Sequence, residues 1–348
     1  MSRRAHLKPD WNFPPGWTVI KTIDVHAAGE PLRVVTAGLP PIPGKSMLAK
    51  RQYAKKNLDH LRTALLWEPR GHADMYGCIP TGPVSPGSHL GILFLHNEGF
   101  STMCGHGIIA FVTAAIETGM IAWQEDEPVL RIDTPAGLVT ARAKVENGRV
   151  SEVSFLNVPS FVYILDKAVD VPGFGQVKVD IAFGGAFYAF CSAQSLGLGL
   201  VPEEFRSLID LGMKVKRAVE GSIPIRHPLE PDLGFLYGTI FVGEPQVKTR
   251  HSRHVCIFAE GEVDRSPTGT GVSGRAALLS ARGELERGRP FVVESIIGTC
   301  FRGCIEARTR LGPYDAVIPE VTGSAFLTGR NEFLINPSDP LRHGFILR

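Results

Sequence analysis

Two stretches decide the fold of this 348-residue chain: Met103-Cys-Gly-His-Gly-Ile-Ile-Ala-Phe-Val-Thr-Ala-Ala-Ile and Pro267-Thr-Gly-Thr-Gly-Val-Ser-Gly-Arg-Ala-Ala-Leu-Leu. Each stretch begins as a glycine-spaced loop and continues as a predicted helix that is small and apolar on most faces. Cys104 and Thr268 open the two helices and lie 164 positions apart (268 − 104), near half the chain. Because self-similarity at a long interval indicates an internal repeat, we predict two pseudo-equivalent lobes.

A helix that is apolar all round has to be surrounded by other elements. Strand signals are frequent: apolar and polar residues alternate from Val139 to Val145, and Asn147-Gly148 then predicts a hairpin turn. No regular βαβ rhythm accompanies them. We therefore expect an α+β fold in which each lobe is a curved, mainly antiparallel sheet around one central helix, with the boundary near residues 157–160.

Two further helices are predicted from their first residues. Ser46 is a preferred helix cap, and the helix after it carries Leu58 on its inner face and Lys50 among its outward, solvated lysines. Pro202 suits the start of a second helix, with Phe205 turned inward. Both helices are interpreted as structural.

The bulk composition narrows the class of protein. The chain has 37 Lys and Arg against 35 Asp and Glu, a formal charge of +2, which argues against nucleic-acid or membrane-surface partners. No apolar run approaches a membrane span, and the six cysteines come without a secretory signal, so we expect a soluble, cytoplasmic protein with reduced thiols. Cys300 and Cys304 form a lone C-x₃-C pair, which is weak evidence for metal, and none is expected.

The two helix starts carry the candidate chemistry. A helix N-terminus presents unpaired N–H groups and a partial positive charge, so it attracts anions and stabilises a thiolate at Cys104. Gly105 and Gly107 would let a ligand approach the backbone. If both starts line one cleft, their amides can hold a carboxylate while a Cys104 base of lowered pKa removes the adjacent proton.

Each of these residues also has a structural interpretation. Cys104 could be a buried structural thiol, and His106 could bond to backbone instead of tuning the thiolate or contacting substrate. Asp264 could pair with a substrate ammonium, or tie its loop together with Arg265. Thr268 could contact substrate through its hydroxyl, but a helix cap is the favoured role.

At this point Met103-Cys-Gly-His-Gly and Asp264-Arg-Ser-Pro-Thr-Gly-Thr-Gly resemble the two signature loops of the proline racemase family. Asp24-Val-His-Ala-Ala-Gly-Glu-Pro-Leu-Arg, Glu68-Pro-Arg-Gly-His-Ala-Asp-Met-Tyr-Gly and Leu95-His-Asn-Glu-Gly-Phe extend the resemblance over nearly the whole chain. It implies the diaminopimelate-epimerase-like fold, a site between two lobes, and usually a homodimer. It also implies that the C-terminal strand returns to the first lobe, giving residues 1–158 plus 324–348 and residues 159–323 as the domains.

In this family each loop normally supplies one acid/base cysteine, but here Thr268 stands where the second would be. A threonine hydroxyl is too weak an acid or base near neutral pH to replace it. The resemblance therefore implies the trans-3-hydroxy-L-proline dehydratase branch, which forms a pyrroline-2-carboxylate without metal or organic cofactor. Cys104 is the implied catalytic residue; the implied substrate-binding residues are Tyr76, Gly105, His106, Phe258, Asp264, Thr268, Gly269 and Thr270.

Two rival functions remain open. The first is a proline racemase or hydroxyproline 2-epimerase in which water or another residue replaces the missing cysteine. The second is a non-catalytic hydroxyproline-binding protein, against which Cys104 argues because binding alone needs no thiol there. In each case the partner is a small amino acid.

Overall fold

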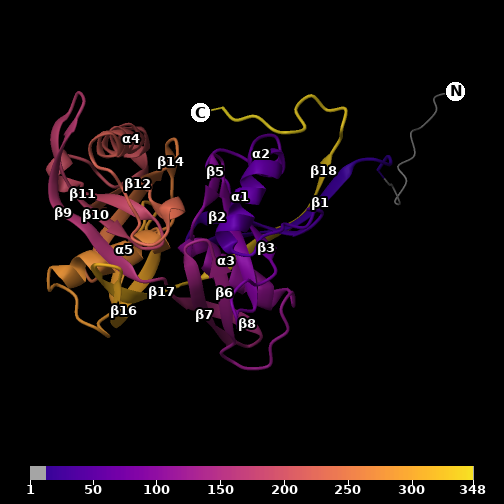
Figure 1. Cartoon of the computed structure of the whole chain (residues 1–348), viewed down its shortest axis with the longest axis horizontal. Helices are drawn as coiled ribbons and strands as arrows, with labels where there is room; N and C mark the ends of the chain where they lie inside the picture. Colours follow the sequence, from indigo (N-terminus) through magenta and orange to yellow (C-terminus); the bar gives the residue numbers. More distant parts are fainter. Residues whose placement is uncertain (1–12, 348) are drawn as a thin grey trace.

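The structure, a computed structural model, describes residues 13–347 and has two lobes that lie side by side (Figure 1). The first set of elements is β1 (Thr18–Ala27), β2 (Glu30–Ala37), α1 (Met47–Asn57), α2 (Asp59–Leu66), β3 (Tyr76–Thr81), β4 (Leu90–His96), β5 (Gly99–Ser101), α3 (Gly105–Glu117), β6 (Val129–Thr134), β7 (Gly137–Glu146) and β8 (Arg149–Leu156). The second set is β9 (Ser160–Val171), β10 (Gly175–Phe183), β11 (Phe187–Ser192), α4 (Phe205–Ser222), β12 (Leu236–Gly243), β13 (Ser252–Phe258), β14 (Glu262–Val263), α5 (Gly269–Ala281), β15 (Phe291–Glu294), β16 (Cys300–Leu311), β17 (Tyr314–Gly323) and β18 (Ala325–Ile335). Short 3₁₀ turns cover Gln194–Leu196, Pro202–Glu204 and Pro231–Leu233.

The strand pairings repeat from one set to the other. β1 pairs with β2 antiparallel, β2 with β3 parallel, and β3 with β4 antiparallel. The same senses recur in β10 with β11, β11 with β12, and β12 with β13. The apolar helices occupy equivalent places, α3 between β5 and β6 and α5 between β14 and β15. The predicted α+β fold with two pseudo-symmetric, mainly antiparallel lobes is therefore confirmed.

Two strands, β9 and β18, complete the sheets beside the strands that begin the repeated pairings. β18 pairs antiparallel with β1, so that Thr18 lies opposite Ile335, and Figure 1 shows the yellow end of the chain beside the indigo beginning. β9 likewise pairs with β10, while β17 pairs with both β8 and β9 and joins the lobes. On these pairings we propose residues 1–158 plus 324–348 as one lobe and 159–323 as the other.

The two central helices are enclosed, as their composition predicts. Every residue of α3 from Gly105 to Ile116 is buried. From Gly269 to Leu279 in α5, Arg275 is the one residue that is not fully buried. Since each fully buried large apolar side chain contributes about 1.5–3 kcal/mol, these helices anchor the positions of both glycine loops.

Some local predictions hold and others are wrong. The hairpin joins β7 to β8, with Asn147 and Gly148 both at positive φ (53° and 75°), and the Ser46 hydroxyl caps α1 by accepting from Ala49 N at 3.1 Å. The single helix expected after Ser46 is wrong, because the chain breaks at Leu58 between α1 and α2. Lys50 is buried, not solvated: its ammonium donates to the Thr81 hydroxyl at 3.3 Å.

The prediction that Phe205 turns inward is also wrong. Pro202–Glu204 forms a separate 3₁₀ turn, so Phe205 becomes the exposed first residue of α4, while Leu208 faces the core. Within residues 13–347, none of the helices is both long and apolar enough to span a membrane.

Candidate active site

The two helix starts meet at a small buried cavity. Its volume is about 20 Å³, and its walls contain every site residue predicted from the sequence. The walls consist of Tyr76, Met103, Cys104, Gly105, His106, Tyr188, Tyr237, Cys256, Phe258, Asp264, Thr268, Gly269 and Thr270. Residues from distant parts of the chain thus share one site, whereas their individual roles remain predictions.

Two glycines allow the helix starts to touch. A Cβ added at Gly105 would lie 2.6 Å from Gly269 Cα, and one added at Gly269 would lie 2.8 Å from Gly105 Cα. A side chain at either position would push the backbones apart. At Gly107 the added Cβ would meet the Phe94 ring at 2.7 Å, so close packing within the protein accounts for these glycines.

Cys104 occupies the N-cap position of α3 with extended backbone (φ −146°, ψ 112°). Its Sγ accepts a hydrogen bond from Gly107 N at 3.2 Å and lies 3.3 Å from His106 Nδ1. The residue is 5% exposed and belongs to the cavity wall. The sulfur therefore takes the place of a capping oxygen and accepts a hydrogen bond from one of the N–H groups that have no partner within the helix.

The expectation of a lowered Cys104 pKa is wrong for this closed cavity. Burial raises the pKa of the Cys104 thiol well above its ordinary value, and the Asp264 carboxylate raises it further. The Gly107 amide and the Tyr76 hydroxyl lower it, but these hydrogen bonds do not offset the desolvation of a fully buried thiolate. Cys104 is consequently a neutral thiol near pH 7 in this state.

His106 supplies a neutral imidazole next to the thiol. Burial lowers its pKa, an effect that Asp264 and the Pro31 carbonyl only partly offset. The ring packs edge-on against Tyr76, with centroids 4.8 Å apart. The ring contacts both Cys104 and backbone, so the structure agrees with the backbone interpretation, and the role of His106 toward the thiolate or the substrate stays a prediction.

Asp264 and Arg265 are held by different partners. Asp264 Oδ1 accepts from Ser266 N at 2.7 Å, which shapes its own loop. Arg265 instead reaches across to the first lobe, where its guanidinium pairs with Asp74 at 2.6 Å and its amide donates to Glu30 at 2.7 Å. Both residues thus contribute to the loop, since Arg265 also donates to the Val263 carbonyl at 2.8 Å, but no direct pair joins them in the described residues, and the Arg265 contacts with Asp74 and Glu30 bridge the two lobes.

Thr268 stands at the N-cap position of α5 but does not cap it. Its backbone is at φ 64° and ψ 92°, which is unusual for a β-branched residue, and its side chain makes no cap hydrogen bond. Within residues 13–347 the buried Thr268 hydroxyl makes no close hydrogen bond, and the group it influences is the Cys256 thiol, whose pKa it lowers. The expected cap is wrong because this backbone turns the hydroxyl away from the helix amides. Strain of this kind, about 1–3 kcal/mol, gathers at functional sites.

Aromatic residues form the rest of the wall, and the sequence indicated only some of them. The Tyr76 hydroxyl lies 3.1 Å from that of Tyr237, which stacks on Phe258 at 5.3 Å. The Tyr188 hydroxyl contacts the Thr270 hydroxyl at 2.7 Å. Tyr188 and Tyr237 were missed because they lie in apolar strands, where only the register decides which side chains reach the site.

Cys256 belongs to the hydrophobic core and also lines the cavity. It lies on β13, two residues before Phe258, and is 1% exposed. Burial raises the pKa of its thiol, while the Thr268 hydroxyl acts in the opposite direction. The wall thus holds a second thiol on the same side as Thr268.

Comparisons with known proteins agree with this geometry. The family model described as "Proline racemase" matches residues 22–346. A Colwellia psychrerythraea protein named "Trans-3-hydroxy-L-proline dehydratase" is 48% identical over 332 residues, covering 95% of this chain and 94% of the relative. A Clostridioides difficile protein named "Proline racemase" is 45% identical and covers 94% and 98%.

Solved structures extend the comparison to the fold. The crystal structure of a hydroxyproline epimerase from Agrobacterium vitis, with bound trans-4-hydroxy-L-proline, superposes with a TM-score of 0.90 at 32% identity, covering 95% of this chain and 96% of that one. A PhzF-family protein of Bacillus anthracis shares the fold alone, with a TM-score of 0.56 at 12% identity over 91% and 99% of the two chains. From its two glycine loops, its paired lobes and these matches, the chain belongs to the proline racemase family.

Proposed function

We propose that this protein dehydrates trans-3-hydroxy-L-proline to a pyrroline-2-carboxylate, with Cys104 as the acid/base residue. The observation that carries the proposal is the pairing of a thiol at the start of α3 with a threonine at the start of α5, in one cavity. A threonine hydroxyl cannot exchange a proton with carbon near neutral pH, so chemistry is confined to the Cys104 side. The Colwellia relative's name supports the same reaction.

The stereochemistry of the substrate makes one base sufficient. In trans-3-hydroxyproline the α-hydrogen and the 3-hydroxyl lie on the same ring face. The Cys104 thiolate takes the α-proton, and the Cα–H electron pair forms the Cα–C3 double bond as the C3–O bond breaks. The thiol then returns its proton to the departing hydroxide, releasing water. The cyclic enamine product tautomerises to the imine, and Cys104 ends in its starting state.

The helix starts would stabilise the negative charge that develops during proton removal. Gly105, His106, Gly269 and Thr270 line the cavity at the starts of α3 and α5, where a substrate carboxylate would accept hydrogen bonds from their backbone N–H groups. The carboxylate of Asp264 would pair with the ring ammonium. That pairing also neutralises a charge that raises the Cys104 pKa, so substrate binding favours the thiolate that catalysis requires.

The test is a substrate panel. The purified protein is incubated with L-proline and with trans-3-, trans-4- and cis-hydroxyprolines while imine formation is followed. Product is expected from trans-3-hydroxy-L-proline, with loss of at least 1,000-fold in Cys104→Ser and normal rates in the control Cys300→Ser. Imine formation that survives Cys104→Ser would contradict the assignment.

A racemase or epimerase is the second candidate, since the Cys256 thiol lines the cavity beside Thr268 and the Clostridioides relative is named a proline racemase. Incubation of L-proline in D₂O separates the two functions. D-proline that forms at an enzymatic rate and disappears in Cys256→Ser would favour this candidate. The expected homodimer and cytoplasmic location stay predictions, tested by light scattering and cell fractionation.

A further inference from the structure

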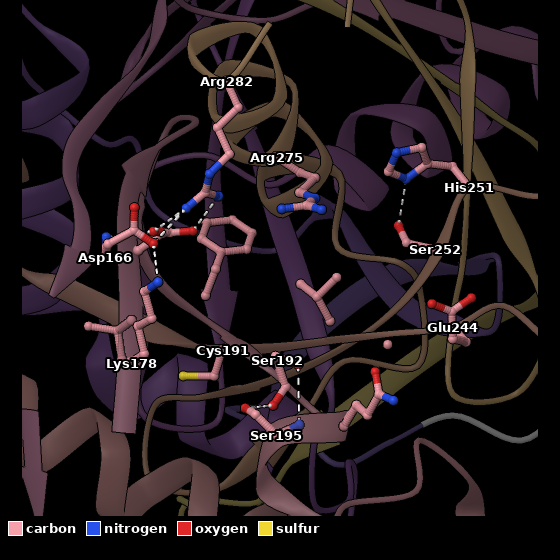
Figure 2. A pocket seen from close by; sticks show the side chains of 16 residues that line it. Asp166, Lys178, Cys191, Ser192, Ser195, Glu244, His251, Ser252, Arg275 and Arg282 are labelled. Atoms are coloured by element: carbon pink, nitrogen blue, oxygen red, sulfur yellow. Dashed lines mark hydrogen bonds and ion pairs between the residues drawn. The ribbon is translucent and has the colours of Figure 1, made fainter. Parts of the chain in front are cut away.

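A second and much larger cavity lies in the lobe that contains α5. Its volume is about 450 Å³, compared with about 20 Å³ at the candidate active site. The walls include parts of β9, β10, β11, the end of β12, the start of β13, α5 and the turn at Gln194–Leu196 (Figure 2). Sites for small molecules typically have volumes of about 300–1,000 Å³, so this cavity is large enough to bind one.

Arg275 is the feature that indicates a ligand. It belongs to α5, whose residues from Gly269 to Leu279 are otherwise buried, and Figure 2 shows its guanidinium in the space between Arg282 and His251. Over residues 13–347, the structure gives Arg275 no hydrogen bond and no ion pair, and its Nε is fully buried without a partner. A buried guanidinium whose N–H donors have no acceptor destabilises the folded protein, and a planar anion such as a carboxylate would accept those hydrogen bonds.

The neighbouring cations, in contrast, already have partners. Arg282 pairs with Asp180 at 2.7 Å and with Asp166 at 3.2 Å. Lys178 pairs with the same Asp166 at 2.7 Å. The dashed lines of Figure 2 show this network ending before Arg275. The cavity therefore supplies one uncommitted guanidinium, not a general excess of positive charge.

An exposed carboxylate in the cavity wall balances the charge of that guanidinium. Glu244 follows β12 and is exposed, and in the described part of the chain it makes no ion pair. Glu244, Asp166 and Asp180 together offset Lys178, Arg275 and Arg282, and His251 is neutral at pH 7 because desolvation and Arg275 lower its pKa. A dianion such as a phosphate ester would leave the cavity with excess negative charge. A zwitterion would instead pair its anionic group with Arg275 and its cationic group with Glu244.

We propose that this cavity binds a small α-amino acid, with its carboxylate on Arg275 and its ammonium toward Glu244. The hydroxyls of Ser192 and Ser195 line the same space and offer further hydrogen bonds. The site is separate from the candidate active site, yet it touches the helix whose first residues line that site. Arg275 follows Thr268 by about two helical turns on α5.

The test uses the full-length protein. The twenty proteinogenic L-amino acids, acetate, methylammonium and inorganic phosphate are screened by thermal shift, and the hits are measured by isothermal titration calorimetry. At least one amino acid is expected to bind, with acetate and methylammonium each at least tenfold weaker. Binding is expected to weaken at least tenfold in both Arg275→Gln and Glu244→Gln.

Two controls keep the outcome unambiguous. Arg206→Gln removes an exposed arginine of α4 and should leave binding unchanged. Circular dichroism checks that each variant folds. If one of the two variants does not fold, the affinity of the other still tests the proposal. The proposal is overturned if no amino acid binds, if acetate or phosphate binds as tightly, or if folded Arg275→Gln and Glu244→Gln retain full affinity, which would place the binding elsewhere. None of these outcomes depends on the proposed dehydration.

Discussion

At the scale of single residues, Thr268 is the position that, in the proposed reaction, limits proton transfer to one face of the substrate ring. It combines a positive φ of 64° with a buried hydroxyl that, within residues 13–347, makes no close hydrogen bond and acts only on the neighbouring Cys256 thiol. A residue held in strain with an unused polar group is directed at the cavity, not at its own helix. Cysteine lacks the branch at Cβ, so it should fit this backbone at least as well.

We therefore predict that Thr268→Cys gains epimerisation. A thiol at this position could return a proton to the ring face opposite Cys104, so deuterium from D₂O should appear at Cα of the inverted product. Chiral chromatography and mass spectrometry measure the exchange. The double variant Cys104→Ser/Thr268→Cys serves as control and should show none. A folded Thr268→Cys protein without inversion would mean that other wall residues set the reaction.

The direction of the Cys104 pKa shift predicts the pH dependence. Burial raises this pKa, and the reaction needs the thiolate, so the reactive fraction of free enzyme is small at neutral pH and grows as pH rises. We expect kcat/KM for dehydration to increase roughly tenfold per pH unit from pH 6 upward. Initial rates across pH 6–9 check this, with circular dichroism to verify folding. A flat profile would show that the free enzyme already holds a thiolate.

The sequence was a good guide to which residues form the site and a poor one to their electrostatics. Cys104 and Asp264 could be predicted because local motifs carry them. The pKa direction could not, since it depends on desolvation by residues from both halves of the chain. Tyr188 and Tyr237 carry no local signal because the strand register alone turns them toward the cavity.

At the scale of elements, the contact between α3 and α5 depends on glycine. Gly105→Ala would place a methyl group 2.6 Å from Gly269 Cα, and both backbones are fixed by buried helices. Because backbone atoms cannot yield as a flexible side chain does, the helix starts must separate. We predict at least a 100-fold loss in kcat/KM together with a lower Tm.

The matched control is Gly221→Ala in α4, where nothing beyond the local helix backbone and the two adjacent residues lies within 4 Å of the added Cβ. Alanine favours helix over glycine by about 1 kcal/mol, so this variant should be as stable as the parent or more stable, with normal activity. Differential scanning calorimetry and initial rates compare the two variants. Equal activity in both would mean that α3 and α5 need not touch.

Helices and strands could be predicted where a local sequence pattern specifies their conformation. They could not be predicted where contacts with distant residues determine burial or the position of a helix end. The apolar run after Cys104 and the Asn147-Gly148 turn specify their conformations alone. The helical periodicity places Lys50 on the face predicted to be solvated. The chain at Thr81 and Gly82 covers it, however, and accepts hydrogen bonds from its ammonium group. The break at Leu58 likewise has no glycine or proline to announce it.

At the scale of the whole molecule, duplication explains why two helix starts face one cavity. The pairings of β1 to β8 recur in β10 to β17, so α3 and α5 are related positions in related lobes. The separation of 164 residues (268 − 104) between Cys104 and Thr268 predicted this. The return of β18 to β1 came from the family resemblance, because a strand's partner 300 or so residues away leaves no mark in its own periodicity.

The lobes of this structure are held closed around the cavity, and one ion pair offers a test of that closure. A volume of about 20 Å³ holds little more than a single water, so a proline-sized ring can enter only after the walls separate. Asp74 of the first lobe pairs with Arg265 of the second at 2.6 Å, and asparagine tolerates the positive φ of 65° at position 74. Asp74→Asn should therefore weaken closure of the two lobes without distorting the loop that carries residue 74.

We expect KM to rise about 3- to 10-fold, equivalent to about 0.6–1.4 kcal/mol, with kcat unchanged or higher because product release is easier. Asp59→Asn, which breaks a pair with Arg62 inside α2, should alter neither constant. A fall in kcat at constant KM would assign Asp74 to chemistry instead of closure.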